Sequence, residues 1–255
     1  INDVMRFLDN VLTDFIERAP EQFDDAKYSA EKERSVGLGV MGFHSYLQQH
    51  SIPLESVMSK AWNKKIFKHI QEHVDQASKD LADERGPCPD AADYGYNERF
   101  SNKTAIAPTA SISIICGGAS PGVEPVAANS YTHKTLSGSF NVRNRYLEEL
   151  LEKHGKNTDD VWSEITTNQG SVSHLDFLTD LEKDVFKTAF ELDQKWIIEL
   201  SGDRTPFISQ AQSINLFVPA DIHKRELHKI HFDAWKKGLK SLYYCRSKSI
   251  QRAEN

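Results

Sequence analysis

Hydrophobic residues recur at helical spacing through most of the first hundred positions of the chain. This spacing predicts helices over about 4–18, 30–49 and 54–85, with Pro53 in the first turn of the third helix. From 99 to 125 the pattern changes to a β-type run, a Ser/Thr-rich bend, an apolar stretch and a Gly/Pro-rich loop. We expect a ligand site in this stretch, because loops between regular elements often carry function.

Helical spacing returns in the second half of the chain and predicts one long packed helix over 178–200. After it the pattern predicts a strand at 213–218, a helix at 221–240 with Asp221 as its N-cap, and a second strand at 241–247. A strand, a helix and a strand within about 35 residues are typical of a parallel βαβ unit.

Composition narrows the classes of function. The 255 residues carry a net charge of −6 and no basic block, which argues against a nucleic-acid partner. The three cysteines, Cys88, Cys116 and Cys245, show no CxxC spacing, so neither a disulfide framework nor a zinc site is predicted. Charged residues interrupt the first apolar run at helical spacing, so that run is neither a signal peptide nor a membrane span. We therefore expect a cytoplasmic protein without a membrane partner.

The stretch "GLGVMG" at 37–42 matches the GxGxxG pattern of dinucleotide-binding sites. That pattern binds a pyrophosphate only where it follows a strand and opens a helix. Here the preceding residues are charged and helical in character, and no β-branched run leads into Gly37. We therefore interpret the glycines as a place of close helix packing.

The bend "APTASIS" at 107–113 is more informative. A strand that runs into a Thr/Ser-rich turn presents backbone N–H groups and hydroxyls at one point, and such points bind anions. The same residues are equally typical of a turn in which Thr109 and Ser111 bond to their own backbone. The residues alone leave both interpretations open.

Other polar residues receive structural interpretations. One predicted helix carries three histidines without a carboxylate or cysteine at matching spacing, so an exposed helix face is favoured over a metal site; they are His223, His228 and His231. Glu124 and the pair Asp203–Arg204 are interpreted as loop residues with turn roles.

Tyr243 and Tyr244 stand next to each other in the predicted strand 241–247. Adjacent side chains of a strand point to opposite faces, so a doublet does not form one aromatic surface. A buried aromatic strand is the ordinary location of such residues, and it leaves the doublet unexplained.

Several segments together resemble the large, catalytic (alpha) subunit of class I ribonucleotide reductases. They are "KTAIAPTASISIICGGASPGVEP", "DRTPFISQAQSINLFVPA" and "AWKKGLKSLYYCRS", with "RSVGLGVMGFHSYLQ" and "LADERGPCP" matching the helices before them. The order and spacing agree with the family, and the resemblance covers nearly all of the chain. It implies an α/β fold, in which residues 1–255 form the C-terminal part of a ten-stranded barrel. The region 1–100 would be mostly helical, and 101–255 would carry the functional residues.

The resemblance implies a role for the Ser/Thr-rich bend. In the family, the matching loop binds the diphosphate of the substrate nucleotide through backbone N–H groups and hydroxyls at a helix start. The substrate-binding residues here would be Pro108, Thr109, Ala110, Ser111, Ile112 and Ser113. Ile112 stands where some relatives carry a threonine, which removes one possible hydroxyl contact.

The resemblance also accounts for the tyrosine doublet. In the family, an oxidising equivalent from the small subunit passes through a residue matching Tyr244, then through one matching Tyr243. It reaches a cysteine that becomes a thiyl radical and abstracts the 3′ hydrogen of the ribose. The strand end must then depart from regular pleating, so that both rings lie on one path.

Several parts of such an enzyme lie outside this sequence. The thiyl cysteine of the finger loop with its Asn and Glu neighbours, one reducing cysteine, and the ATP and dNTP effector sites would precede Ile1. Ile1 stands in the middle of a helical pattern, which suggests that sequence precedes it. A cysteine-bearing tail that receives electrons from thioredoxin or glutaredoxin would follow Asn255. The di-iron tyrosyl radical centre belongs to the small subunit; we expect no metal or cofactor on this chain, and no thiyl role for its own cysteines.

The predicted function is the reduction of ribonucleoside diphosphates to deoxyribonucleoside diphosphates by radical chemistry. The N-terminal portion of the large subunit and the small subunit would be its partners. One alternative is a non-catalytic or regulatory remnant of the same barrel that binds a nucleotide or a partner subunit. Another is a nicotinamide-dependent oxidoreductase that uses Gly37–Gly42, which would show cofactor absorbance on purification.

Overall fold

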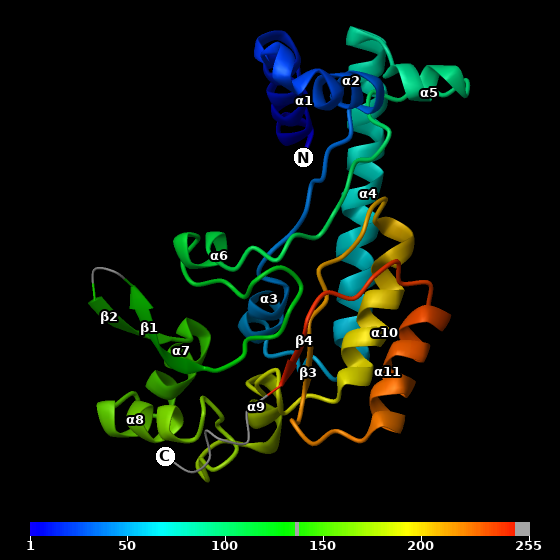
Figure 1. Cartoon of the computed structure of the whole chain (residues 1–255). Coiled ribbons are helices and arrows are strands. Elements are labelled where there is room, and N and C mark those ends of the chain that lie inside the picture. The colour runs from blue at the N-terminus through cyan, green and yellow to red at the C-terminus, as the bar shows by residue number, and fades with distance from the viewer. Residues whose placement is uncertain (136–137, 248–255) are drawn as a thin grey trace.

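The structure is a computed structural model that describes residues 1–135 and 138–247. These residues form mainly helices, with four short strands in the second half of the chain (Figure 1). In chain order the elements are α1 (Asn2–Arg18), η1 (Glu21–Phe23), α2 (Asp24–Glu33), α3 (Phe43–Gln49), α4 (Val57–Arg85), α5 (Pro89–Asp93), α6 (Ile112–Ile115), β1 (Ser130–Thr135), β2 (Gly138–Arg143), α7 (Arg145–Lys153), α8 (Asp159–Thr167), α9 (Asp180–Val185), α10 (Gln194–Arg204), η2 (Thr205–Phe207), β3 (Leu216–Val218), α11 (Lys224–Lys236) and β4 (Cys245–Ser247).

Helices α1, α2 and α5 gather at one end of the long helix α4 (Figure 1). The buried carboxylate of Asp9 joins them, accepting bonds from Arg34 at 2.7 Å, Arg85 at 2.7 Å and Arg99 at 2.8 Å. Burial by itself would raise the pKa of Asp9, but these guanidinium groups lower it below its usual value. The carboxylate therefore stays ionised and holds four segments of the chain together.

The predicted helices 4–18 and 54–85 correspond to α1 and α4. Helix α4 begins at Val57, because the Ser56 hydroxyl accepts a bond from the Ser59 N–H at 3.1 Å and caps the helix. Gly86, with φ of 84°, ends it.

The prediction of one helix over 30–49 is wrong. Helix α2 ends at Glu33, Arg34 takes a left-handed φ of 43°, and an extended segment leads to α3 at Phe43. A Cβ on Gly39 would lie 2.4 Å from the Ala105 carbonyl oxygen, so this segment needs glycine to approach a second extended segment. The close packing predicted for these glycines therefore exists, but between extended segments instead of helices.

Extended segments lie next to one another in a parallel row. Leu38 pairs with Thr104, Ile106 pairs with Gln212, and β3 pairs with β4. Helix α11 connects β3 and β4, which confirms the predicted parallel βαβ unit. Both strands are shorter than the predicted 213–218 and 241–247, and the two tyrosines precede β4.

The long helix predicted over 178–200 is also wrong, because its residues form α9, a turn and α10. Thr179 and Glu182 form a capping box at the start of α9, and the Asp193 carboxylate caps α10 through the Lys195 N–H at 3.0 Å. Leu181, expected on the buried face, is exposed. Helix α11 likewise starts one turn later than predicted, with His223 instead of Asp221 as its N-cap.

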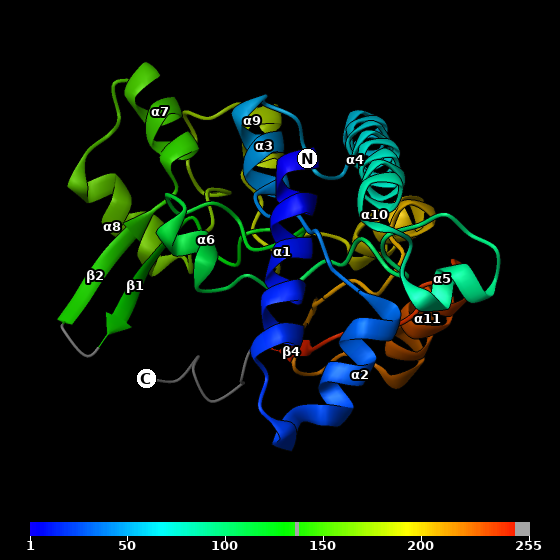
Figure 2. The ribbon, with the colours of Figure 1, turned by 90° about the horizontal axis from the view of Figure 1, so that it is seen from above.

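The elements lie on two sides of α3 in both views of the ribbon (Figures 1 and 2). The hairpin of β1 and β2 lies with α7 and α8 on one side, where α7, α8 and α9 enclose an apolar cluster that includes Trp162. Helices α4, α10 and α11 pack together on the other side. The main apolar core, which includes Phe43, Phe67 and Leu200, lies among α3, α4 and α10. No helix within the described ranges is long and apolar enough to cross a membrane.

Candidate functional site

Residues 107–113, which we call the phosphate loop after the role that the family resemblance predicts for them, follow directly after the paired residue Ile106. Thr109 takes a left-handed φ of 51°, which is uncommon for a β-branched residue. Its hydroxyl accepts a bond from the Gly122 N–H at 2.7 Å. As an acceptor the hydroxyl holds the bend in shape, and its own O–H can still be donated.

The end of the phosphate loop is the start of the one-turn helix α6. Ser111 occupies its N-cap position, is exposed, and makes no side-chain capping bond. The first N–H groups of a helix have no partners within it, but the Ser113 N–H already donates to the Thr109 carbonyl at 2.9 Å, which leaves the N–H groups before it as the candidates for an acceptor. Pro108, Ala110 and Ile112 are exposed as well, whereas Ser113 is buried and its hydroxyl bonds to the Ala110 carbonyl at 3.2 Å.

Tyr243 and Tyr244, which we call the tyrosine pair, have ring centroids 4.2 Å apart and ring planes inclined by 58°. The rings are close because both residues lie before β4, outside the regular pleat. A hydrogen bond with Tyr244 is the main reason why the pKa of Tyr243 is raised. The side chains are 51% and 54% exposed, and the Arg246 guanidinium lies 5.7 Å from the centroid of the Tyr244 ring. The pair is thus two phenols in contact at the molecular surface.

The backbone of the tyrosine pair is held by the segment before β3. The Tyr243 N–H donates to the Ile214 carbonyl at 2.8 Å, and the Tyr244 carbonyl accepts from the Leu216 N–H at 2.9 Å. The Tyr244 N–H donates to the Asn215 side-chain oxygen at 3.0 Å. These bonds fix the main chain and leave both phenols unobstructed.

One loop, residues 117–126, connects the phosphate loop to the segment that holds the tyrosine pair. Its Gly122 bonds to Thr109 of the phosphate loop, and its Glu124 lies against Asn215, the partner of Tyr244. Helix α3 anchors this loop through His44, whose Nδ1 accepts from the Val126 N–H at 3.1 Å. Burial lowers the pKa of His44 to about 3, so the ring stays neutral and keeps this acceptor.

Comparison with known proteins decides the family. The model of the ribonucleotide reductase barrel domain matches residues 1–99 and 90–245. This chain belongs to the ribonucleotide reductase barrel-domain family. The large subunit of the ribonucleoside-diphosphate reductase of invertebrate iridescent virus 6 is 50% identical over 258 aligned residues, which cover 100% of this chain and 27% of the relative. The corresponding protein of invertebrate iridescent virus 3 is 46% identical, covering 97% of this chain and 40% of the relative.

A solved structure agrees with these relatives. The alpha subunit of a class Id ribonucleotide reductase from Actinobacillus ureae matches with a TM-score of 0.90 at 39% identity. The match covers 97% of this chain and 46% of that one. The resemblance noted in the sequence is therefore confirmed, and the chain spans less than half the length of these relatives of the reductase family.

The structure rules out dinucleotide binding at the glycine motif. Protein groups already occupy the N–H groups at the start of α3. Gly42 donates to the Ser120 carbonyl at 2.7 Å, and the Ser45 N–H donates to the Ser120 hydroxyl at 3.1 Å. A pyrophosphate would have to displace these bonds, which fix the 117–126 loop.

The remaining polar residues take positions that the sequence only partly indicated. His223 caps α11, and His228 stacks on Phe232, with ring centroids 5.9 Å apart. Within residues 1–135 and 138–247, no group of three His, Cys, Asp or Glu side chains could hold a metal ion. Asp203 and Arg204 lie in α10 instead of a loop, and Arg204 is buried with bonds to Asn63, Ser201 and Gln212. Its pKa is lowered to about 9 by burial.

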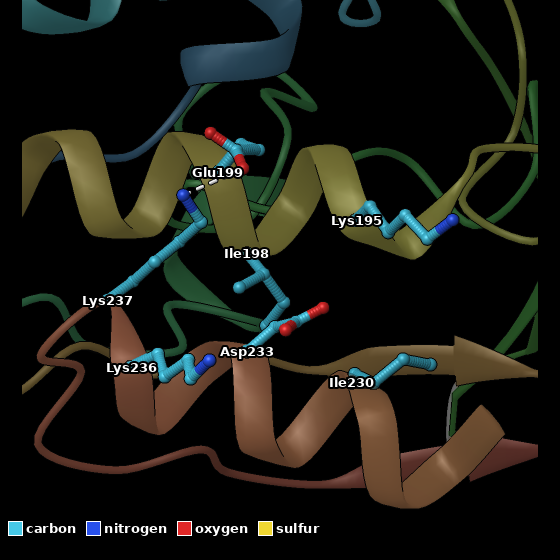
Figure 3. A pocket seen from close by; sticks show the side chains of 7 residues that line it. All are labelled: Lys195, Ile198, Glu199, Ile230, Asp233, Lys236 and Lys237. Carbon is cyan, nitrogen blue, oxygen red and sulfur yellow. Dashed lines mark ion pairs between the residues drawn. The ribbon is translucent and has the colours of Figure 1, made fainter. Parts of the chain in front are cut away.

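Two cavities are relevant to the site. One of about 340 Å³ lies behind the phosphate loop, and its lining includes Ala110, Ser113 and Pro121. Another of about 440 Å³ lies between α10 and α11, where Lys237 pairs with Glu199 at 2.7 Å (Figure 3). No residue of the phosphate loop or the tyrosine pair lines the second cavity. Residues of the phosphate loop line the first cavity, so we place the candidate site there.

Sequence reasoning missed the residues that connect the two regions. His44, Ser120 and Asn215 lie in the segments that carry the family resemblance but were assigned no role, and Glu124 was interpreted as an ordinary turn residue. Glu124 is only 9% exposed, which a Gly/Pro-rich loop does not suggest. The one signal in the sequence was an acidic residue within an otherwise uncharged segment, 104–130.

Proposed function

We propose that this chain is the C-terminal part of the large subunit of a class I ribonucleotide reductase and contributes to the reduction of ribonucleoside diphosphates. Its similarity to two viral large subunits, at 50% and 46% identity, supports this assignment. The observation that carries it is the tyrosine pair, whose rings lie 4.2 Å apart outside the regular strand. A structural role for two exposed phenols would not need that arrangement.

The phosphate loop would bind the diphosphate of the substrate. Its bend places exposed residues at the start of α6, where backbone N–H groups and the Ser111 hydroxyl can donate to phosphate oxygens. Thr109 would hold the bend by accepting from Gly122, and its O–H would donate to a phosphate oxygen. Ser113 is buried, so it would contribute through its bond to Ala110.

The tyrosine pair would carry the oxidising equivalent to the active site. Tyr244 would lose one electron and its phenolic proton, and would then recover both from Tyr243. Tyr243 would in turn recover an electron and a proton from a thiol, leaving a thiyl radical. The contact between the two phenols supports a short transfer, and the backbone bonds to Ile214 and Leu216 keep the rings in place.

The rest of the reaction requires other chains or segments. The thiol of the finger loop, the effector sites and the remaining strands of a ten-stranded barrel would come from the N-terminal portion of the large subunit. A di-iron tyrosyl radical centre in the small subunit would supply the oxidising equivalent. Thioredoxin or glutaredoxin would restore the reducing cysteines after turnover.

The decisive experiment is native mass spectrometry of the chain purified from its source, with every co-purifying polypeptide sequenced and the complex assayed for CDP reduction. We expect a partner that carries the finger-loop cysteine, and a complex that forms dCDP when the small subunit is added. A chain that is isolated alone, and that gains no activity with those partners, would contradict the proposed function.

A further inference from the structure

Glu124 is a buried acidic residue that the proposed reaction does not use. Its side chain is 9% exposed, and its Oε1 has no hydrogen-bond partner among the residues that the structure describes. Buried carboxylate oxygens in proteins are normally paired, so an under-satisfied one needs an explanation. Burial raises the pKa of Glu124, while hydrogen bonding from Asn215 and the charge of Arg246 oppose that effect.

Asn215 connects Glu124 to the tyrosine pair. Asn215 is almost fully buried and lies next to Glu124, where its side-chain amide and its backbone N–H oppose the rise in the pKa of that carboxyl. The oxygen of the same amide accepts the Tyr244 N–H at 3.0 Å. A single side chain thus spans the distance between the carboxylate and the backbone of Tyr244.

The orientation of the Asn215 amide depends on the chemistry of its neighbours. An amide group can be turned so that its oxygen and nitrogen exchange places, and only one orientation gives the Tyr244 N–H an acceptor. An ionised carboxylate accepts hydrogen bonds and cannot donate them. Glu124 therefore selects the orientation in which the nitrogen faces Glu124 and the oxygen faces Tyr244.

Arg246 adds a second connection between Glu124 and the pair. It follows Tyr244 by two residues in β4, its guanidinium lies 5.7 Å from the centroid of the Tyr244 ring, and its charge acts on both Glu124 and Tyr243. The carboxylate attracts this guanidinium from the side of the 117–126 loop. Both connections therefore reach the same tyrosine.

We infer that Glu124 is a positioning residue for the tyrosine pair. As a carboxylate it orients the Asn215 amide and attracts Arg246, and through them it holds Tyr244 in register with the segment before β3. The effect on turnover rests on the proposed function, whereas the effect on the Tyr244 backbone does not.

Amide hydrogen exchange of the 255-residue chain, labelled with ¹⁵N-tyrosine, tests the positioning directly. In Glu124→Gln the side chain keeps its shape but can donate as well as accept, so the Asn215 amide is no longer held in one orientation. We expect the Tyr244 N–H to exchange roughly 2- to 10-fold faster, the range that corresponds to losing one hydrogen bond. The Tyr243 N–H bonds to a backbone carbonyl and is the internal reference, whose exchange should not change.

Glu55→Gln is the matched control, because Glu55 also accepts hydrogen bonds, from Lys187 and the Asp193 N–H, without touching the tyrosines. Its variant should leave both tyrosine amides unchanged. The inference is wrong if Glu124→Gln speeds the exchange of the Tyr243 and Tyr244 N–H groups equally. It is also wrong if neither N–H group exchanges faster. An equal change would indicate general loosening of the sheet instead of positioning.

Kinetics of the complete enzyme separate this inference from the proposed function. We expect Glu124→Gln to lower kcat and leave KM for CDP unchanged, because the tyrosine pair acts in the chemical step. An unchanged kcat, in an enzyme that Tyr244→Phe inactivates, would overturn the effect on turnover. If Tyr244→Phe remains active, the proposed function fails, and the exchange measurement still decides whether Glu124 positions Tyr244.

Discussion

The phosphate loop and the tyrosine pair are held in different ways. The loop depends on a side chain, since the Thr109 hydroxyl accepts the Gly122 N–H and keeps a β-branched residue at a φ of 51°. The pair depends on bonds of its main chain, to the backbone of Ile214 and Leu216 and to the Asn215 side chain, so its phenols are not needed to hold it. The loss of a hydroxyl is therefore expected to disturb the loop more than the position of the tyrosine pair.

The largest expected effect is on turnover. Tyr244→Phe keeps the ring and the backbone bonds but removes the phenol that would lose an electron and a proton. We expect CDP reduction by the complete enzyme to fall below detection. The melting temperature of the chain and the affinity of the enzyme for CDP should stay unchanged. Tyr94→Phe, at an exposed tyrosine after α5, is the control. Normal turnover in Tyr244→Phe would refute the relay.

The second effect is on substrate affinity. Ser111→Ala removes an exposed hydroxyl at the start of α6. A hydrogen bond to a charged group contributes about 1.5–3 kcal/mol, so KM for CDP should rise by roughly 10- to 150-fold with kcat retained. Steady-state kinetics measures both, with Ser101→Ala, an exposed serine before the loop, as the reference. An unchanged KM would remove Ser111 from the substrate site.

The smallest effect is on the stability of the loop. Thr109→Val keeps the shape of the side chain but removes the acceptor of the Gly122 N–H, and Gly122 is buried. Leaving a buried donor unpaired costs about 1–3 kcal/mol, so the free energy of unfolding should fall by that amount in urea denaturation of the chain. Thr109→Ser keeps the hydroxyl and should retain most of the stability. Equal stability of the valine and serine variants would show that this bond does not hold the loop.

The sequence predicted those elements whose signals are local. Helices α1 and α4 have regular apolar spacing, and the βαβ unit has two apolar runs on either side of a helix, so each was found. The segment 30–49 was predicted as one helix because its spacing is also helical. Only the contact between Gly39 and the Ala105 carbonyl explains why it is extended there.

The candidate site was predicted in part for the same reason. The phosphate loop and the tyrosine pair stand in short, recognisable motifs. Glu124 and Asn215 lie in the same family segments, but no role was predicted for them, because their importance comes from a contact between residues far apart in the chain. The interpretation of Glu124 as a turn residue described its position in the sequence correctly but could not include its burial.

The sequence by itself determined which stretches could form helices, where α1 and α4 end, and to which family the chain belongs. Helix periodicity and capping depend on residues a few positions apart, and the family motifs are short. Only the tertiary structure decided that extended segments around Leu38, Thr104, Gln212 and β4 lie side by side. That arrangement brings Thr109, Gly122, Glu124, Asn215 and Tyr244 into one connected group, because the packing of distant segments depends on shape and hydrogen bonding that no local pattern encodes.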